Sequence, residues 1–407
     1  MRVGVLGGGM QGCCCALALA ARGVDVTLFD RNDQLVSRAG VANEGKVHLG
    51  YMYANDPSYS TARMMIDGAL TFAPFLSRHL DVAAETLAVS RPAVYVVHRD
   101  SQRSVDDVAG YLTAVHDLVA EAAATRAGSY FGRDLSPQPR RWSAWELEEE
   151  FDGNVALAAF DTPEVAINPV ALAEAMRERV QSERRIAVRL GHEVLSVEDV
   201  QRPVVVTRDA GETTRHRFDH VINALWDGRL AVSETLGLRP GRPWLHRLKY
   251  GVSFRLPERA RRPRSATFVS GPFGEVVTYR DGLVYLTWYP TCMRSISSDL
   301  APPDWPTYPG EPLRSEIVRG TLEAMKAFVV SLAELAADEL TEVTVKGGVI
   351  VAWGETDIYD PASELHRRYE IGVTSHGRFH AVDPGKLTMV PHFAELCADR
   401  IVQGAAP

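Results

Sequence analysis

The sequence predicts an α/β protein in which a Rossmann-type dinucleotide-binding domain is joined to an α+β domain with an antiparallel sheet. Three observations predict this. The first thirty residues have the pattern of a strand, a glycine-rich turn, a helix and a second strand. Residues 239–345 contain short alternating strands separated by turn residues. The length of 407 residues also exceeds that of one ordinary domain.

The glycine-rich turn has the spacing of a nucleotide-binding motif. Gly7 permits a sharp turn, Gly9 lets backbone N–H groups approach a pyrophosphate, and Gly12 lets the helix lie close to the strands. Asp30 follows at about the separation expected of the acid that binds a ribose hydroxyl. We therefore expect a bound dinucleotide. This stretch alone does not distinguish NAD from FAD.

Composition and charge argue against several classes of partner. The net charge is −8, both signs are mixed along the chain, and the basic run at 258–264 is short, so nucleic acid is not expected as a partner. The first strand begins at Met1, which leaves no room for a signal peptide, and no apolar run approaches about 18 residues. We expect a cytoplasmic protein that does not bind membranes.

The cysteines indicate neither a metal site nor a disulfide framework. Cys13, Cys14 and Cys15 are adjacent in the first helix, whereas Cys292 and Cys397 stand far away in the sequence. Adjacent helical positions point in different directions, so the three neighbours cannot form a metal cage or a simple set of disulfides. We expect small, buried helix residues and no bound metal, with flavin attachment through a cysteine left as an alternative.

The remaining elements follow in order. Residues 41–58 form a polar loop that we expect to be functional, because long loops beside nucleotide sites usually are. Helices are predicted from Asp56 to about Leu76, over 105–124 and over 168–180, and strands over 91–99 and within 185–209. A strand within 218–224 returns to the dinucleotide sheet. A long helix is predicted over 311–340, with Gly320 as its weakest point.

Three separated segments resemble the FAD-dependent amino-acid oxidase superfamily, which includes D-amino acid oxidase, glycine oxidase and sarcosine oxidase. They are GGGMQG with Asp30, NEGKVHLGYMYA at 43–54 and HAVDPGKLTMVPHFAE at 380–395, with VINALW as a weaker fourth match. The second segment is particularly similar to the branch that contains 2-hydroxyglutarate and glycerol-3-phosphate dehydrogenases. The resemblance is poor over 85–150 and 235–345.

The resemblance implies an interleaved architecture with FAD as the cofactor. The FAD-binding domain would comprise 1–84, 151–234 and 346–407, and the substrate-binding domain 85–150 and 235–345. The residues implied to bind FAD are Gly7, Gly9, Met10, Gln11, Gly12, Asp30, Arg31, Asn43, Glu44, Gly45, Lys46, His48, Val194, Ala224, Gly385, Lys386, Leu387 and Thr388.

In such enzymes a hydride passes from a carbon that bears nitrogen or oxygen to the flavin, and the protein supplies position and charge. The reduced flavin needs positive charge at its N1–C2=O edge, which a helix N-terminus provides. Residues 383–388 have the form of such a helix start. There Gly385 lets the backbone approach, Lys386 adds charge and Thr388 can donate its hydroxyl.

The substrate residues are less clearly indicated. Members that act on amino acids hold the carboxylate with an arginine fork, for which Arg294 is the first candidate and Arg378, on a loop that lies over the ring in relatives, the second. His48 could act as an acid or base for a hydroxy acid, bind the cofactor, or simply be packed. Further candidates on the sheet face are Tyr250, Tyr279 and Tyr289.

These features predict an FAD-dependent amino acid oxidase that oxidises the C–N bond of an amino acid or N-substituted glycine and passes the electrons to oxygen. One alternative is a 2-hydroxy acid or polyol-phosphate dehydrogenase, which the NEGKVHLGY segment favours, although the chain lacks a basic amphipathic helix for membrane docking. The other alternative is a dinucleotide-binding protein without turnover.

Overall fold

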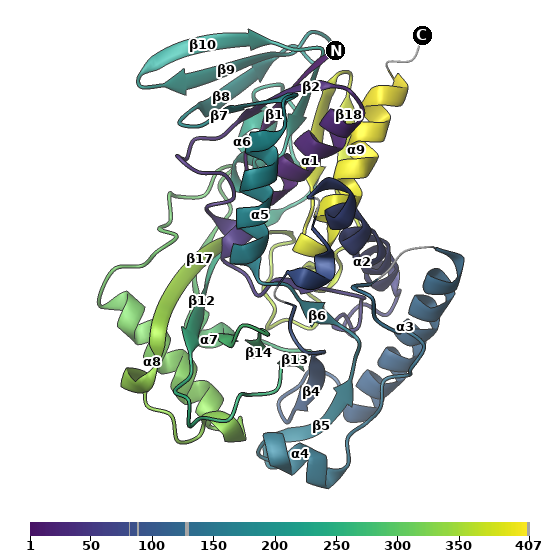
Figure 1. Ribbon diagram of the computed structural model, residues 1–407, viewed down its shortest axis with the longest axis vertical. Helices are drawn as coiled ribbons and strands as arrows, with labels where there is room; N and C mark the ends of the chain where they lie inside the picture. Colours follow the sequence, from purple (N-terminus) through teal and green to yellow (C-terminus); the bar gives the residue numbers. More distant parts are fainter. Residues whose placement is uncertain (81, 88, 127–129, 405–407) are drawn as a thin grey trace.

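The computed structural model describes residues 1–80, 82–87, 89–126 and 130–404. Two sheets organise the molecule. In Figure 1 the first sheet lies in the upper half with both chain termini, and the second sheet lies in the lower half with α8 and α4. The α/β fold class that the sequence predicts is confirmed, with Rossmann-type and largely antiparallel parts interleaved along the chain.

The first sheet has six strands in the order β18-β19-β11-β1-β2-β7. All neighbours are parallel except β18 and β19. Val3 and Val5 of β1 are fully buried, as expected for a central parallel strand that is covered on both faces. The strands are β1 (Arg2–Leu6), β2 (Asp25–Phe29), β7 (Ile186–Arg189), β11 (His220–Asn223), β18 (Gly372–His376) and β19 (Phe379–Asp383).

Helices cover one face of this sheet and a small antiparallel sheet lies near the other. Helix α1 (Met10–Ala21) is buried from Met10 to Ala20 between the strands and its neighbours α5 (Pro169–Ser182) and α9 (Val390–Gly404). Its small Ala and Cys side chains permit this close packing, and all five cysteines of the chain are free and buried. The small sheet comprises β8 (Glu193–Glu198), β9 (Val204–Asp209) and β10 (Glu212–Arg217).

The second sheet has eight strands, of which seven follow the order β16-β12-β15-β14-β13-β4-β5 while β17 pairs with β12. Its pairs are antiparallel except β4 with β13. One face packs on α8 (Leu313–Lys326) through a core that includes Phe254, Leu286 and Leu322. The strands are β4 (Val94–His98), β5 (Ala156–Asp161), β12 (Trp244–Arg255), β13 (Ala266–Val269), β14 (Gly274–Thr278), β15 (Leu283–Trp288), β16 (Met293–Ser297) and β17 (Thr341–Trp353).

Shorter elements connect these layers. Strands β3 (Lys46–Val47) and β6 (Val165–Ala166) form a two-stranded sheet. The other helices are α2 (Ser60–His79), α3 (Val105–Thr125), α4 (Ala144–Glu150), α6 (Arg229–Glu234) and α7 (Tyr289–Cys292). The 3-10 helices are η1 (Ala39–Val41), η2 (Ala84–Thr86), η3 (Trp226–Gly228), η4 (Val330–Leu332), η5 (Ala337–Glu339), η6 (Glu364–His366) and η7 (Leu387–Met389).

The structure corrects the predicted helix over 311–340. Helix α8 runs through Gly320 without interruption but ends at Lys326. Beyond it the chain turns so that Phe328 and Val329 enter the core, where Val329 forms a β-bridge with Phe151. Burial of these two apolar side chains therefore overrides the helical pattern that the sequence suggests.

Two strands near the predicted domain boundaries pair in the second sheet. Strand β5, expected in the FAD-binding domain, pairs with β4 in the eight-stranded sheet. Strand β17, whose second half was assigned to the FAD-binding domain, pairs with β12 along its length. Both strands satisfy their backbone hydrogen bonds in the second sheet, so they belong to it structurally.

Candidate active site

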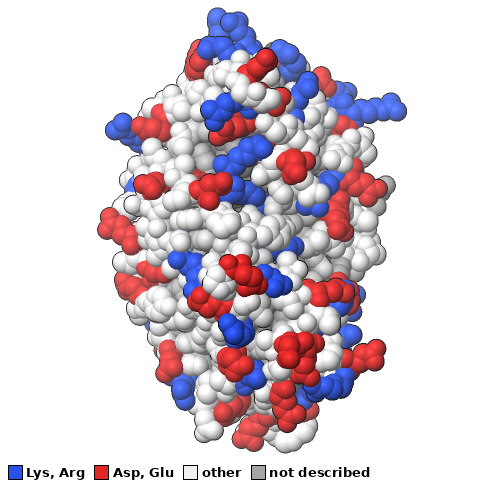
Figure 2. Space-filling model, turned by 90° about the vertical axis from the view of Figure 1, so that its left-hand side faces the viewer, with Lys and Arg blue, Asp and Glu red and all other residues white. Residues whose placement is uncertain are grey.

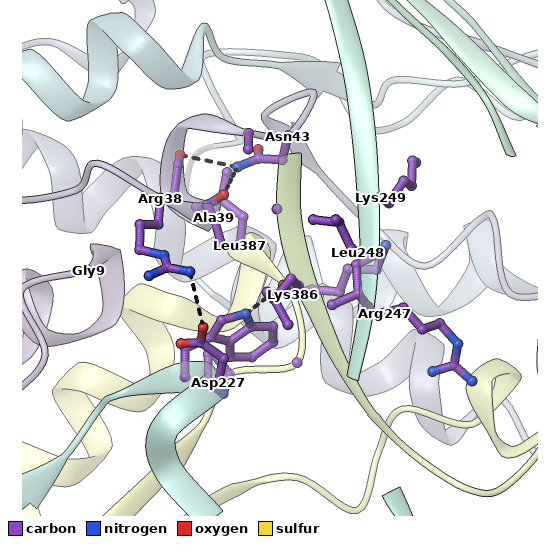
Figure 3. Close-up of a pocket in the computed structure, with 18 of the residues that line it drawn as sticks. Gly9, Arg38, Ala39, Asn43, Asp227, Arg247, Leu248, Lys249, Lys386 and Leu387 are labelled. Carbon is purple, nitrogen blue, oxygen red and sulfur yellow. Dashed lines mark hydrogen bonds and ion pairs between the residues drawn. The ribbon is translucent and has the colours of Figure 1, made fainter. Parts of the chain in front are cut away.

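A cavity of about 620 Å³ is lined by residues of both sheets. Its wall includes Gly7, Gly9 and Asp30 from the first sheet and its turns, and Arg247 and Thr287 from the second sheet. In the view of Figure 3, Gly9 and Arg247 lie on opposite sides of the pocket, with Lys386 between them. Figure 2 shows acidic and basic side chains intermingled on one face of the molecule around a hollow.

The glycine turn leaves space where a pyrophosphate is expected. A Cβ atom added to Gly9 would meet no atom within 4 Å, and Gly9 lines the cavity. A Cβ on Gly12 would lie 1.8 Å from the carbonyl oxygen of Gly7, so α1 can approach the turn only because Gly12 lacks a side chain. The open cradle in front of Gly9 fits the phosphates of the expected dinucleotide.

Asp30 shapes this turn as well as facing the cavity. Its Oδ2 atom accepts a hydrogen bond of 2.6 Å from the backbone N–H of Gly8, and its Oδ1 atom accepts from Asn32. Other predicted residues that line the cavity are Met10, Gln11, Arg31, Val194 and Ala224.

Sequence reasoning missed several residues near this end of the cavity. Arg38 and Asp227 both line it, and their side chains lie 3.8 Å apart, as drawn in Figure 3. Asp304, from the proline-containing loop before α8, lies 3.3 Å from the Arg38 guanidinium. No local pattern signals these residues, because they come from three separate segments of the chain.

The loop before β3 directs several side chains into the cavity. Gly45 has a φ of +70°, and a Cβ there would lie 1.8 Å from the carbonyl oxygen of Ile167, so this position requires glycine. Asn43 accepts a hydrogen bond from the Gly45 N–H and donates to the carbonyls of η1. The fixed loop places Asn43, Glu44, Lys46 and His48 on the cavity wall.

His48 forms a buried dyad with Glu164, a residue that the sequence did not indicate. Nδ1 of His48 lies 3.3 Å from Oε2 of Glu164, which also accepts a hydrogen bond from the hydroxyl of Tyr95. Burial opposes the charge of Glu164, but these two partners and Lys46 hold its pKa below the ordinary value. Nε2 of His48 has no hydrogen-bond partner among the described residues, and Glu44 lies 3.9 Å from it.

The predicted helix start near the carboxyl end contributes a cation. Gly385 has a φ of +59°, and Gly385, Lys386 and Leu387 line the cavity. Burial lowers the pKa of Lys386 to about 8. Thr388 is not among the residues that line the cavity. Its hydroxyl is buried behind the wall, where it accepts a hydrogen bond of 2.9 Å from the backbone N–H of His48.

Both predicted substrate arginines lie outside the cavity lining, and their role in substrate binding stays a prediction. Helix α7 turns the chain after β15, and β16 then pairs with β12, so the Arg294 guanidinium points to Glu316 of α8 at 2.8 Å. Arg378 lies in the turn between β18 and β19, where its backbone N–H donates to the carbonyl of Val200. Neither side chain therefore contributes to the cavity wall.

Two other arginines, Arg247 and Arg368, line the cavity. Arg247 is 1% exposed; its Nε donates to Oδ1 of Asp357 at 3.1 Å, while its Nη1 has no hydrogen-bond partner among the described residues. Arg368 donates to the carbonyls of Leu365 and Gly385, and burial lowers its pKa. Both arginines line the cavity, so each has capacity to bind an anion.

The three predicted tyrosines have different roles. Tyr289 lines the cavity and donates its hydroxyl to Oδ1 of Asp357 at 2.7 Å. Tyr250 and Tyr279 lie outside the lining: the hydroxyl of Tyr250 binds the carbonyl of Pro306, and that of Tyr279 binds the carbonyl of Glu44. Tyr279 thus supports the loop before β3.

Residues of the Rossmann-type sheet and of the second sheet line the same cavity, an arrangement that fits a dinucleotide-dependent oxidoreductase. Residues 2–337 match the DAO family, described as FAD dependent oxidoreductase, and the chain belongs to this family. FAD is therefore its cofactor, as the resemblance implied. Among the residues that would hold it are those of the glycine turn, which leaves the open cradle.

Solved structures of similar fold cover nearly the whole chain. Glycine oxidase from Geobacillus kaustophilus is 15% identical, with a TM-score of 0.67 over 99% of this chain and 95% of that one. NikD, an unusual amino acid oxidase essential for nikkomycin biosynthesis, is 16% identical, with a TM-score of 0.68 over 99% and 94%. L-alpha-glycerophosphate oxidase from Mycoplasma pneumoniae is 16% identical, with a TM-score of 0.66 over 99% and 94%.

A curated relative matches over a shorter stretch. The FAD-dependent monooxygenase FPY4 of Fusarium mangiferae is 38% identical over 80 residues. This stretch covers 19% of this chain and 21% of that protein.

Among the described residues, no helix is long and apolar enough to span a membrane.

Proposed function

We propose that the protein oxidises the C–N bond of an amino acid or N-substituted glycine, with transfer of a hydride to FAD and of the electrons to oxygen. The observation that carries this proposal is the distribution of charge in the cavity. Arg247 and Arg368 present guanidinium groups, whereas the Glu44 carboxylate lies beside the open Nε2 atom of His48. A zwitterion matches this distribution, with its carboxylate on the arginines and its nitrogen near Glu44.

The residues of the chain would bind the substrate and move its proton. FAD supplies the hydride acceptor when it is bound. Because the Glu164 carboxylate accepts a hydrogen bond from Nδ1 of His48, Nε2 is left with a free lone pair that can receive a proton from the substrate nitrogen. Lys386 adds positive charge to the same cavity, which favours anionic groups there.

The second candidate function is oxidation of a 2-hydroxy acid, and the His48–Glu164 dyad favours it. An amine can lose a proton to water before it binds, whereas an alcohol keeps its hydroxyl proton and needs a base in the site. The third alternative, a binding protein without turnover, requires a closed or missing substrate site. The cavity wall instead carries open groups on His48 and Arg247.

Matched pairs of acids test the proposal. The purified holoenzyme is mixed without oxygen with three matched pairs while flavin bleaching is followed. The pairs are glycine or glycolate, serine or glycerate, and homoserine or 2,4-dihydroxybutyrate, the last two of either configuration. Hydrogen peroxide is then measured in air. We expect bleaching and peroxide with amino acids. Bleaching by the hydroxy acids alone would support the second candidate, and no bleaching by either class would support the third.

The variant Glu44→Gln sharpens this comparison. Loss of the carboxylate should raise KM for an amino acid about tenfold, because one hydrogen bond to a charged group is weakened. The KM for a hydroxy acid should not rise. Equal effects on both classes would contradict the assigned role of Glu44. Glu193→Gln, at the exposed edge of the same cavity, is the matched control.

A further inference from the structure

We propose that the cavity contains a subsite for a substrate side chain that ends in a hydrogen-bond donor, such as a hydroxyl or an amide. The inference rests on the proposed oxidation of a carboxylate-bearing substrate and narrows its class. The subsite is formed by Thr267 of β13, Glu275 of β14 and Thr287 of β15, which we call the polar row.

The polar row crosses three neighbouring strands on one face of the sheet. Thr267 is paired with Glu275, and Glu275 with Thr287. Directly opposed residues on antiparallel strands point to the same face, and all three line the cavity. On the other face, Phe268, Val276 and Leu286 belong to the apolar core under α8. The row therefore places polar groups on the cavity face of a sheet whose other face is apolar.

Lys46 donates hydrogen bonds to two members of the polar row, Thr267 and Glu275. Its Nζ lies 2.9 Å from Oε2 of Glu275 and also donates a hydrogen bond to the hydroxyl of Thr267. Burial opposes the charge of Glu275, but Lys46 and then Lys249 hold its pKa well below the ordinary value. Glu275 is therefore an ionised carboxylate that faces the cavity and accepts hydrogen bonds.

At the other end of the row, the hydrogen-bonding capacity of Thr287 is unused by the residues that the structure describes. Thr287 is fully buried at 0% exposure, and its hydroxyl has no hydrogen-bond partner among the described residues. Buried polar groups without partners are rare in folded proteins. The hydroxyl or amide group of a ligand, placed at this end, could donate a hydrogen bond to the Glu275 carboxylate and accept one from the Thr287 hydroxyl.

The surroundings of the row indicate the stem of that side chain. Val269, Phe273 and Tyr285 line the cavity beside it and offer apolar and aromatic surface. The buried hydroxyl of Ser270 also lacks a partner among the residues that the structure describes. A substrate side chain made of a short carbon chain with a polar end matches this wall better than a single hydrogen atom or a purely alkyl side chain would.

Binding of acids that cannot be oxidised at the α-carbon tests the polar row without turnover. Perturbation of the flavin absorbance spectrum of the holoenzyme gives Kd for two pairs: γ-hydroxybutyrate with valerate, and δ-hydroxyvalerate with hexanoate. In each pair a hydroxyl replaces a methyl group. We expect the hydroxylated acid of at least one pair to bind about tenfold more tightly. Equal or weaker binding of both hydroxylated acids overturns the proposal.

Variants test whether the tighter binding of the hydroxylated acid depends on the polar row. Thr287→Val, which keeps the shape of the side chain, should abolish the preference, whereas Thr287→Ser should retain it. Ser270→Ala provides a second measurement and should reduce it. Thr214→Val, on the exposed strand β10, is the matched control. An unchanged preference in both Thr287→Val and Ser270→Ala overturns the proposal, provided that the flavin content equals that of the wild type.

This experiment is independent of the proposed reaction. If no amino or hydroxy acid bleaches the flavin but the hydroxylated acids still bind more tightly, the proposed function fails while the subsite stands. If amino acids bleach the flavin and both members of each pair bind equally, the subsite fails while the function stands.

Discussion

Nδ1 of His48 lies 3.3 Å from Oε2 of Glu164, although 116 positions separate the two residues in the sequence. The short sheet of β3 and β6 accounts for this contact. Lys46 pairs with Ala166 and Val47 with Val165, so the residues that follow β3 lie beside the residue that precedes β6. The dyad is therefore a consequence of strand pairing, and it gives the cavity a fixed, oriented imidazole.

The variant Glu164→Gln should slow reduction of the flavin by about 100-fold, because the amide does not stabilise a charged imidazole as the carboxylate does. Stopped-flow measurement of the flavin absorbance without oxygen gives this rate. Glu183→Gln, which affects a surface pair with Arg179, is the control and should not change it. A rate within threefold of the wild type would contradict the role of Glu164 in supporting His48 as the base.

The variant Gly12→Ala should yield protein that has lost most of its FAD, because the new Cβ would lie 1.8 Å from the carbonyl oxygen of Gly7 and force α1 away from the turn. The ratio of flavin to protein absorbance after purification measures this loss. Gly110→Ala in α3 is the matched control: its Cβ meets no atom within 4 Å, and we expect full flavin content and a gain in stability of about 1 kcal/mol. Full flavin content in Gly12→Ala would contradict this account of the turn.

The variant Arg247→Lys should raise KM for a carboxylate substrate by about 10- to 100-fold, because lysine keeps the charge but loses the planar fork. Steady-state kinetics with the best substrate of the panel measures the change. Arg294→Lys, the corresponding change at the arginine paired with Glu316, should leave KM unchanged. The reverse result would restore Arg294 as the substrate residue and refute the assignment to Arg247.

A histidine pair in the first sheet should make stability depend on pH. Nδ1 of His220 lies 3.0 Å from Nε2 of His380. Burial, and to a smaller extent repulsion from His220, lowers the pKa of His380 to about 4. Between about pH 6.5 and pH 4 the unfolded state binds more protons at this site. The free energy of unfolding should therefore fall as the pH decreases through this range, by up to about 3 kcal/mol.

Thermal unfolding across this range tests the effect of the pair. His380→Gln should flatten the dependence of Tm on pH between 6.5 and 4, whereas His376→Gln, at an exposed position of β18, should leave it as in the wild type. An identical slope in wild type and His380→Gln would show that other groups control acid unfolding.

The sequence predicted those features whose causes lie within a few neighbouring residues. Gly7, Gly9 and Gly12 form one turn, and the loop that contains Gly45 keeps Glu44, Lys46 and His48 on one wall. Arg294 is a candidate in the sequence because it follows a strand of the right sheet. Its side chain lies outside the cavity lining, because α7 and the pairing of β16 with β12 direct it to Glu316, and no recognisable local pattern encodes these two features.

The amino-acid sequence by itself determined the fold class, the dinucleotide turn and the loop that carries His48, because short-range spacing and backbone freedom decide them. Only the tertiary structure decided which partners meet in the cavity. Glu164 reaches His48 through β6, Arg247 replaces Arg294 on the wall, and Thr287 is aligned with Glu275 by strand register. Such contacts depend on pairing and packing between distant segments, which local residue patterns do not specify.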